Sequence, residues 1–249
     1  MSPQQPHQTA RRLAFDSTAS LVPGWSPNLI KARAYESLLL DVILGVLEPG
    51  ARLDEQDLVQ RYDTGLAGVR EALGRLALEG LVIRRARSGT LVAPLDAQEA
   101  RQTLDVRALL EPHAAALAAE NADPEEVDAL ARAFDGAEAA IESGDLRALV
   151  LMDQTFHARL AAASGNPALA GLIAPLQHRA ARVWIATLPT EDSAARLIGD
   201  MQSHRAIVTA IAMRDGVAAR AAMLKALGVV RNSASRLSSR RPSPELHAA

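Results

Sequence analysis

The N-terminal fold is decided by residues 48–94, EPGARLDEQDLVQRYDTGLAGVREALGRLALEGLVIRRARSGTLVAP. A helical pattern, with apolar residues recurring every three or four positions, precedes it from Leu29 to Leu47. Glu48-Pro49-Gly50 ends this pattern, because proline and glycine do not favour continuation of a helix. Asp54 is a suitable N-cap for a short second helix, EQDLVQRY. The stretch therefore begins with two helices joined by a tight connection.

A third helix and a hairpin complete this part of the chain. After the turn Asp63-Thr64-Gly65, a helix is expected over residues 66–79, and Gly80 stands where a left-handed C-cap is favoured. Two short β-rich runs then flank Arg87-Ser88-Gly89, which predicts a β-hairpin. Three helices followed by a hairpin are the elements of a winged helix-turn-helix, which we expect over residues 29–94.

This arrangement predicts a DNA-binding surface. In a helix-turn-helix the helix after the tight turn enters the major groove, and the hairpin of the winged form lies along the backbone or the minor groove. Arg84, Arg85 and Arg87 form a dense basic cluster in this hairpin, where they can neutralise phosphates. The alternative interpretation of the cluster is a solubilising surface turn.

Composition limits the class of protein. The chain has 249 residues, which favours two domains, and its low aromatic content of 3% implies cores built from Ala, Leu, Val and Ile. The absence of cysteine excludes disulfides, thiolate metal sites and cysteine nucleophiles. No apolar run approaches the roughly 20 residues that span a bilayer, and no signal peptide is apparent. We expect a cytoplasmic protein that does not contact membranes.

Charge is distributed unequally along the chain. The net charge is −2, which by itself gives no indication of nucleic-acid binding. Residues 29–93 hold nine basic and nine acidic residues, whereas residues 94–231 hold 13 basic and 18 acidic residues. DNA contact is therefore expected only through a local basic face of the N-terminal part.

The remainder of the chain is predicted to be helical. Asp123-Pro124-Glu125-Glu126 combines an N-cap, a first-turn proline and an acidic N3 residue, which makes it the strongest helix start. Breaks are expected at Ser143-Gly144-Asp145, Gly165-Asn166-Pro167, Pro189 and Asp215-Gly216. These breaks predict an all-α, six-helix bundle over residues 95–231. Residues 1–28 and 232–249 are expected to be disordered tails.

The chain resembles a known family at this point. Residues 48–62 and 68–94 look like the DNA-binding domain of GntR transcription regulators. The C-terminal half looks like the FCD effector domain of the FadR branch, on motifs that occur in order: VRALLE at 106–111, DQTFH at 153–157, GNP at 165–167, SHRAI at 203–207 and then Asp215. Six effector helices resemble the VanR-like subgroup more than the seven-helix FadR subgroup.

The resemblance implies a regulator rather than an enzyme. It implies a homodimer that binds a short palindromic operator in double-stranded DNA, with an affinity controlled by a small carboxylate metabolite. By family position, Arg70 is the best candidate to contact a guanine edge or a phosphate; the alternative is a surface arginine paired with an acid such as Glu71. The further DNA-binding candidates are Arg75, Arg84, Arg85, Arg87, Ser88, Gly89 and Thr90.

The third helix departs from the family pattern at its start. Where family members usually carry Ser-Arg-Thr-Pro, this chain has Gly65-Leu66-Ala67-Gly68. An N-cap serine, a base-contacting arginine, a phosphate-binding threonine and a helix-starting proline are all replaced. We expect an operator that differs from the usual one, or binding that is weak or depends more on the hairpin. A ligand-binding protein with a degenerate DNA-binding domain is the alternative function.

Three residues suggest a metal site in the helical half. Asp153 and His157 are four apart on one helix face and can share a divalent cation. In the FCD domain this pair and two later histidines hold a metal that the carboxylate of the effector caps. His204 matches the first later histidine, whereas the position of the second is Ala226.

Two interpretations of this set remain open. Zn, Ni or Mn can still bind, with water, the effector or His178 in the fourth place. Alternatively, His157, His204 and Arg107 bind the effector carboxylate directly, without metal. Arg107 is either an effector-binding residue, as the resemblance implies, or half of an i,i+4 surface pair with Glu111. A metal-dependent helical-bundle enzyme would need a fuller ligand set, such as paired Glu-x-x-His motifs.

Overall fold

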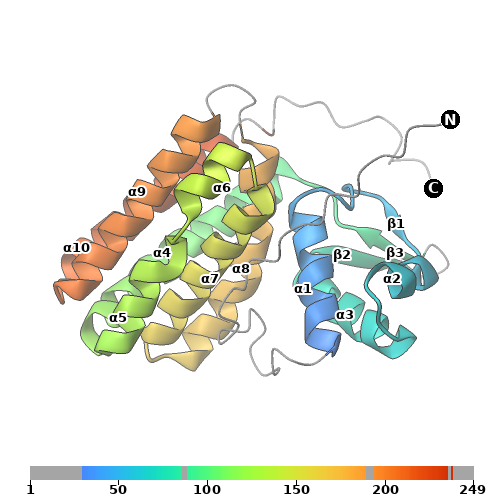
Figure 1. Cartoon of the computed structure of the whole chain (residues 1–249), viewed down its shortest axis with the longest axis horizontal. Helices are drawn as coiled ribbons and strands as arrows, with labels where there is room; N and C mark the ends of the chain where they lie inside the picture. Colours follow the sequence, from blue (N-terminus) through green and yellow to red (C-terminus); the bar gives the residue numbers. More distant parts are fainter. Residues whose placement is uncertain (1–29, 86–88, 189–192, 235–236, 238–249) are drawn as a thin grey trace, which may run out of the picture.

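The computed structural model describes residues 30–85, 89–188, 193–234 and 237. Its N-terminal part contains three helices and a small sheet, and its C-terminal part is helical (Figure 1). The N-terminal elements are α1 (Ile30–Ile43), β1 (Arg52–Leu53), α2 (Glu55–Arg61), α3 (Leu66–Leu78), β2 (Val82–Arg85) and β3 (Gly89–Val92). This order confirms the winged helix-turn-helix.

The C-terminal part corrects the expected number of helices. Its elements are α4 (Ala97–Asn121), α5 (Pro124–Ala131), the 3-10 turn η1 (Arg132–Phe134), α6 (Ala137–Ser143), α7 (Leu146–Ala163), α8 (Pro167–Ala186), α9 (Ser193–Ala212) and α10 (Gly216–Ala234). The described residues of the C-terminal part thus form seven α-helices, and the prediction of six is wrong. Gly136, with φ of 85°, divides the segment between Asp123 and Gly144 that we expected to be one helix. The assignment to the VanR-like subgroup rested on a count of six helices and therefore loses its support.

The sheet adds a strand that the sequence pattern does not reveal. Its antiparallel order is β1-β3-β2, and β1, only two residues long, pairs Arg52 with Leu91. The hairpin register pairs Arg85 with Gly89, whose φ of 81° explains why glycine is favoured at this turn. The predicted turn residues Arg87 and Ser88 lie outside the described residues.

The two parts of the chain share an apolar core. Tyr35 of α1 and Leu73 of α3 are fully buried in it, and Val150 of α7 and Ala181 of α8 belong to the same cluster. Accordingly, α1 packs against both α3 and α8, and Figure 1 shows α8 on the side of the bundle nearest to α1. The DNA-binding part is therefore docked on the bundle through α8.

A second core fills the helical bundle. In the middle of it, α4 packs against α7, α8, α9 and α10, and buries Ala114, Ala115 and Ala118 completely. Small side chains let helix axes approach closely, which suits a chain with few aromatic residues. Phe156 of α7 is the largest fully buried side chain of this bundle core.

Helix ends follow the capping residues that the sequence suggests. Asp54 and Asp123 accept hydrogen bonds from the first turns of α2 and α5, and Asp123 forms a full capping box with Glu126. At the other end, α10 continues to Ala234, three residues beyond the predicted end of the bundle at residue 231. The predicted tail at residues 1–28 lies outside the described part of the chain.

Candidate functional site

A cavity of about 60 Å³ lies inside the helical bundle. All four predicted effector residues, Arg107, Asp153, His157 and His204, line it. They come from α4, α7 and α9, so the fold brings together side chains that are almost 100 positions apart in the sequence. Much of the remaining wall is apolar, including Phe134, Leu149, Met201, Met223 and Leu227.

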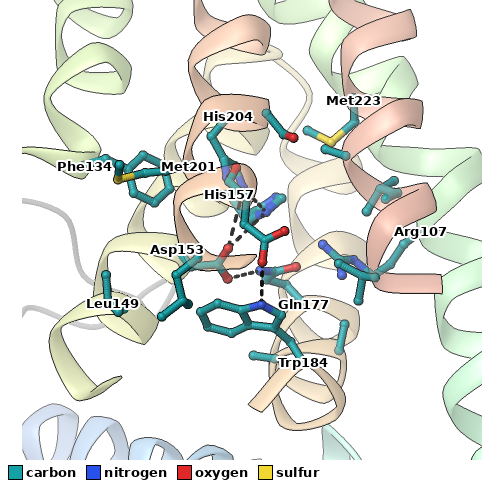
Figure 2. A pocket seen from close by; sticks show the side chains of 18 residues that line it. Arg107, Phe134, Leu149, Asp153, His157, Gln177, Trp184, Met201, His204 and Met223 are labelled. Atoms are coloured by element: carbon teal, nitrogen blue, oxygen red, sulfur yellow. Dashed lines mark hydrogen bonds and ion pairs between the residues drawn. The ribbon is translucent and has the colours of Figure 1, made fainter. Parts of the chain in front are cut away.

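Asp153, His157 and His204 converge on one point (Figure 2). Their potential ligand atoms all lie within 4.8 Å of one another. Oδ1 of Asp153 is 3.7 Å from Nε2 of His157 and 3.6 Å from Nε2 of His204. The two Nε2 atoms are 3.3 Å apart. A carboxylate and two imidazoles therefore face a common centre, as ligands of a divalent cation do.

The other nitrogen of each ring determines the tautomer. Nδ1 of His204 lies 2.8 Å from the backbone oxygen of Asp200, and it must donate because a carbonyl oxygen only accepts. Nδ1 of His157 lies 3.0 Å from Oε2 of Glu111, close enough for strong attraction although poorly aligned for a hydrogen bond. Burial lowers the pKa of His204 to about 4, so this ring is neutral at pH 7. The Nε2 lone pair of His204 therefore points to the shared centre, 3.3 Å from Nε2 of His157.

Glu111 links this centre to Arg107. Its carboxylate is fully buried and bonds Nε and a terminal nitrogen of Arg107 as well as facing His157. Burial alone raises the pKa of Glu111, but the charges of Arg107 and His157 outweigh it and bring that pKa to about 2. The Arg107 side chain is only 4% exposed, so the interpretation of a surface pair is wrong. Arg107 belongs to the cavity wall.

Four further polar residues line the cavity and were not predicted as site residues: Gln177, Trp184, Asp200 and Ser203. Gln177 donates from Nε2 to Oδ2 of Asp153 at 2.7 Å (Figure 2). Trp184 donates from Nε1 to Oδ2 of Asp200 at 2.9 Å, and burial raises the pKa of Asp200. The helical pattern of α8 contains no motif that marks Gln177 or Trp184. Only the packing of α8 against α7 reveals their position.

Ala226 occupies the fourth ligand position, and His178, the suggested substitute ligand, lies elsewhere in the structure. Ala226 does line the cavity, as its place in the family pattern implies. His178 does not line it: its Nδ1 lies 3.0 Å from Oε2 of Glu79, in the contact between α8 and the end of α3. His178 is therefore not placed to complete the set.

The predicted recognition helix presents Arg70 to solvent. Its side chain is 61% exposed, and Nε donates at 2.8 Å to Glu55 of α2, an acid that the sequence analysis did not name. Arg84 of β2 donates to the backbone oxygen of Arg70 at 3.1 Å, which places the hairpin against the same helix. Arg85 is exposed. These arginines make a basic surface that runs from α3 to β2.

Two predicted DNA-binding residues occupy less accessible positions. Arg75 is partly buried, with Nε 3.2 Å from Glu79 and its guanidinium 5.0 Å from the ring centre of Tyr35. Thr90 is only 9% exposed. In contrast, the exposed Arg52 of β1 was not predicted, and its guanidinium lies beside Gly89 at the start of β3. No sequence pattern marks Arg52, because β1 is too short to be recognised.

Helix α3 begins at the predicted position, although it lacks the Ser-Arg-Thr-Pro residues with which this helix usually begins in the family. The helix begins at Leu66, and Gly65 occupies the N-cap with no side-chain hydrogen bond. A Cβ atom on Gly68 would lie 2.7 Å from Oγ1 of Thr64, so the hydroxyl of the preceding turn occupies the space of a side chain. The recognition helix is thus formed but uncapped.

A winged helix-turn-helix docked on a helical bundle with a buried polar cavity defines a DNA-binding regulator with a ligand-binding domain. Comparisons with known proteins agree. The profile of the gntR family of bacterial regulatory proteins matches residues 30–92, and that of the FCD domain matches residues 102–228. The chain therefore belongs to the GntR family, with an FCD effector domain, and is a transcription regulator and not an enzyme.

Individual relatives cover most of the chain. It is similar to the HTH-type transcriptional regulator LutR of Bacillus subtilis, with 32% identity over 206 residues, 72% of this chain and 90% of that protein. It is also similar to the HTH-type transcriptional repressor GlaR of Escherichia coli, with 31% identity over 193 residues, 73% of this chain and 84% of that protein. The structure of E. coli McbR/YncC has the same fold, with a TM-score of 0.74 at 21% identity, covering 84% of this chain and 99% of that one. None of the helices that the structure describes is long and apolar enough to cross a membrane.

Proposed function

We propose that a small carboxylate effector, bound at a divalent metal in the helical domain, controls the affinity of this regulator for its operator. Asp153, His157 and His204 would hold the metal. The observation that carries the proposal is the 3.3 Å approach of two imidazole Nε2 atoms beside a carboxylate. A cation at this centre would accept a lone pair from each Nε2 atom and offset the negative charge of Asp153, whereas without a cation only one N–H···N hydrogen bond can join the two rings.

The contacts around the histidines favour the metal over direct binding of the effector. Metal-free binding would need His157 and His204 to donate from Nε2. Nδ1 of His204 instead donates to the backbone oxygen of Asp200, and Nδ1 of His157 faces Oε2 of Glu111 at 3.0 Å. Such outer contacts orient metal-binding histidines in many proteins. A bound cation would supply the positive charge that an anionic effector requires in a cavity lined by Asp153 and Asp200.

Three protein ligands would leave coordination positions open. Catalytic and sensory sites commonly keep such positions for an exogenous ligand, whereas structural sites are closed by four protein ligands. Ala226 leaves room at the fourth position, and Arg107 lies in the same wall. The effector carboxylate would therefore bind beside the cation, with the guanidinium of Arg107 as a second anchor. Zn, Ni and Mn all accept this ligand set.

Metal analysis of protein purified without a histidine tag tests the proposal. We expect about one equivalent of Zn, Ni or Mn per chain, and substitution His204→Ala should remove it. His113→Ala is the matched control, because His113 is exposed on α4. A wild-type protein that contains no metal, and shows no thermal shift when Zn, Ni or Mn is added, would reject the metal and leave the direct mode of binding.

The DNA side of the proposal rests on the surface formed by α3 and the hairpin. Arg70 is exposed at the start of the recognition helix, and Arg84, Arg85 and Arg52 extend a basic surface along the sheet. Gly89, at the start of β3, would contact the DNA backbone beside it. We propose that a homodimer places two such surfaces on a palindromic operator. Light scattering of the free protein and of its complex with selected genomic fragments would measure this stoichiometry.

Helix α8 would carry the signal between the two sites. Gln177 donates to Asp153 in the cavity, and the next residue, His178, contacts Glu79 at the C-terminal end of the recognition helix. Glu79 also accepts from the hydroxyl of Tyr35 at 2.6 Å, and these partners lower its pKa despite burial. Trp184 lines the cavity and also packs on the core of the DNA-binding part. A shift of α8 would therefore move α3.

A further inference from the structure

Two buried side-chain atoms of the cavity residues form no hydrogen bond with the described residues: Nδ1 of His157, which faces the carboxylate of Glu111, and Oε1 of Gln177. Gln177 is 4% exposed and lines the cavity. Its Nε2 donates to Oδ2 of Asp153 at 2.7 Å. Because a carboxylate only accepts, the amide nitrogen must face Asp153, which fixes the orientation of the amide. Its oxygen, Oε1, is left without a hydrogen bond.

An unpaired acceptor in this place indicates a donor in the ligand. Most buried polar side-chain atoms have a hydrogen-bond partner, and the exceptions need an explanation. Leaving such a group unpaired costs about 1–3 kcal/mol. A ligand without a donor would displace water from Oε1 and incur that cost. A ligand with a donor would restore the hydrogen bond.

The other polar groups of the cavity show which ligand this favours. Acceptors face the centre from Asp153 and from Nε2 of His204. The indole N–H of Trp184 is already used by Asp200. A bare carboxylate would bring only more acceptors to this cavity. The metal and Arg107 can hold the carboxylate of an effector, and a donor on the effector is what would satisfy Oε1 of Gln177.

We propose that the effector is a small hydroxycarboxylate whose hydroxyl donates to Oε1 of Gln177. The inference rests on the proposed carboxylate site. Since Gln177 and Asp153 are in direct contact, the hydroxyl lies close to the carboxylate of the effector, as in 2- and 3-hydroxy acids. A hydroxyl fits better than an ammonium group, because one amide oxygen satisfies the single donor of a hydroxyl but only one of three ammonium hydrogens.

Matched ligands test this assignment. The probes are lactate, propionate, 2-methoxypropionate and alanine, and the four-carbon pair malate and succinate. Each is titrated calorimetrically into full-length protein loaded with Mn²⁺ or Zn²⁺. We expect at least one hydroxy acid to bind about tenfold or more tightly than its deoxy partner. The methyl ether, which keeps the oxygen but lacks the donor, should bind no better than propionate.

Variants separate Gln177 from the metal, because a hydroxyl can also coordinate a cation. Gln177→Met removes both contacts of the amide, whereas Gln177→Lys keeps a donor for Asp153 and lacks the acceptor. Both should lose the preference for the hydroxy acid. Gln154→Met is the matched control: Gln154 donates to the same Oδ2 at 3.3 Å and is buried, but is not among the residues that line the cavity. This variant should keep the preference.

The outcomes distinguish a failure of the hydroxyl assignment from a failure of the carboxylate site on which it rests. Equal binding of hydroxy and deoxy acids overturns the hydroxyl assignment and leaves the carboxylate site standing. A preference that persists in both Gln177 variants, or a stronger response to alanine, also overturns it. If no carboxylate of the panel binds with either metal, the proposed carboxylate site itself fails, and the inference fails with it. Circular dichroism of each variant confirms that the fold is retained.

Discussion

Ala226 is the residue at which this effector site departs from the family pattern, and its effect can be measured directly. It lies in the cavity wall with the three candidate ligands. A histidine there would offer a fourth nitrogen to the metal. We expect Ala226→His to raise the affinity for Zn²⁺ or Ni²⁺ by about tenfold or more, about 1.4 kcal/mol. Competition with a metal-sensitive dye would measure it.

The control for this substitution is the neighbouring residue. Lys225 is exposed on the same helix, and Lys225→His adds a histidine that cannot reach the cavity. Its metal affinity should equal that of the wild type. An Ala226→His protein with unchanged affinity would contradict the placement of the metal between Asp153, His157 and His204.

Glu111 has the largest predicted effect on stability of any single residue in the site. It is fully buried and balances the charge of Arg107, which is also buried. Glu111→Gln removes the negative charge and leaves the guanidinium uncompensated. Breaking a buried pair in this way typically costs about 3–5 kcal/mol, so the free energy of unfolding in urea should fall by that amount.

An exposed ion pair provides the comparison for Glu111. Glu138 and Arg205 lie 2.7 Å apart at the surface, with more than half of each side chain exposed. Surface pairs contribute little, because water and salt screen them. Glu138→Gln should therefore leave the unfolding transition unchanged. An equal loss in both variants would mean that burial does not set the strength of the Arg107 pair.

At the scale of the element, the recognition helix depends on a few exposed side chains. Helix α3 lacks a side-chain cap, and Arg70 is its most exposed candidate for DNA contact. A bidentate contact to a base is worth about 1–3 kcal/mol. Arg70→Ala should therefore weaken operator binding by about tenfold or more, measured by gel-shift titration at fixed salt.

Arg101 on α4 is the matched control, since it is exposed but lies in the helical domain. Arg101→Ala should bind the operator as the wild type does. If Arg70→Ala also retains full affinity, α3 is not the helix that enters the major groove. The protein would then bind DNA in a different mode, in which the hairpin and Arg52 make the main contacts.

Element lengths explain which parts of the fold can be predicted from the sequence. Helices α2, α3, α5 and α7 begin after capping or turn residues that act locally, and their starts agree with the sequence pattern. Strand β1 has two residues, and its pairing with β3 depends on partners 37 and 39 positions away. The division between α5 and α6 depends on Gly136, a lone glycine in an otherwise helical pattern. Local patterns are too weak to reveal either feature.

At the scale of the whole molecule, the coupling of the two sites depends on α8. His178 contacts Glu79 across the junction between the domains. His178→Leu removes this contact and leaves Glu79 with Tyr35 and Arg75. We expect metal and effector binding to change by less than about twofold, while the effect of the effector on operator affinity falls by about tenfold. Parallel titrations of effector and DNA would measure both.

A second contact between the domains serves as the control. Arg147 of α7 bonds Asp41 of α1, outside the path through Gln177 and His178. Arg147→Gln should keep the response to the effector, and His178→Asn, which retains a side-chain donor, should restore part of it. If Arg147→Gln abolishes the response as completely as His178→Leu, domain docking in general, and not the α8 contact, couples the sites.

The sequence by itself determined the class of protein and much of its site. Capping residues, turns and hydrophobic periodicity act over a few positions, so the winged helix-turn-helix and the helical domain follow from local pattern. Asp153 and His157 are four apart on one helix face, and the order of the motifs added His204, Arg107 and Ala226. The resemblance was specific because several motifs occur in register.

Only the tertiary structure decided which polar groups meet. Gln177 and Asp153 are 24 positions apart, and His178 and Glu79 are 99 apart. Packing of α8 between α7 and α1 creates both contacts. The same packing buried Arg107 with Glu111 and left Oε1 of Gln177 unpaired. Burial, tautomer and pairing are properties of the packed interior, where each group responds to neighbours that are distant in the chain, and no local pattern encodes them.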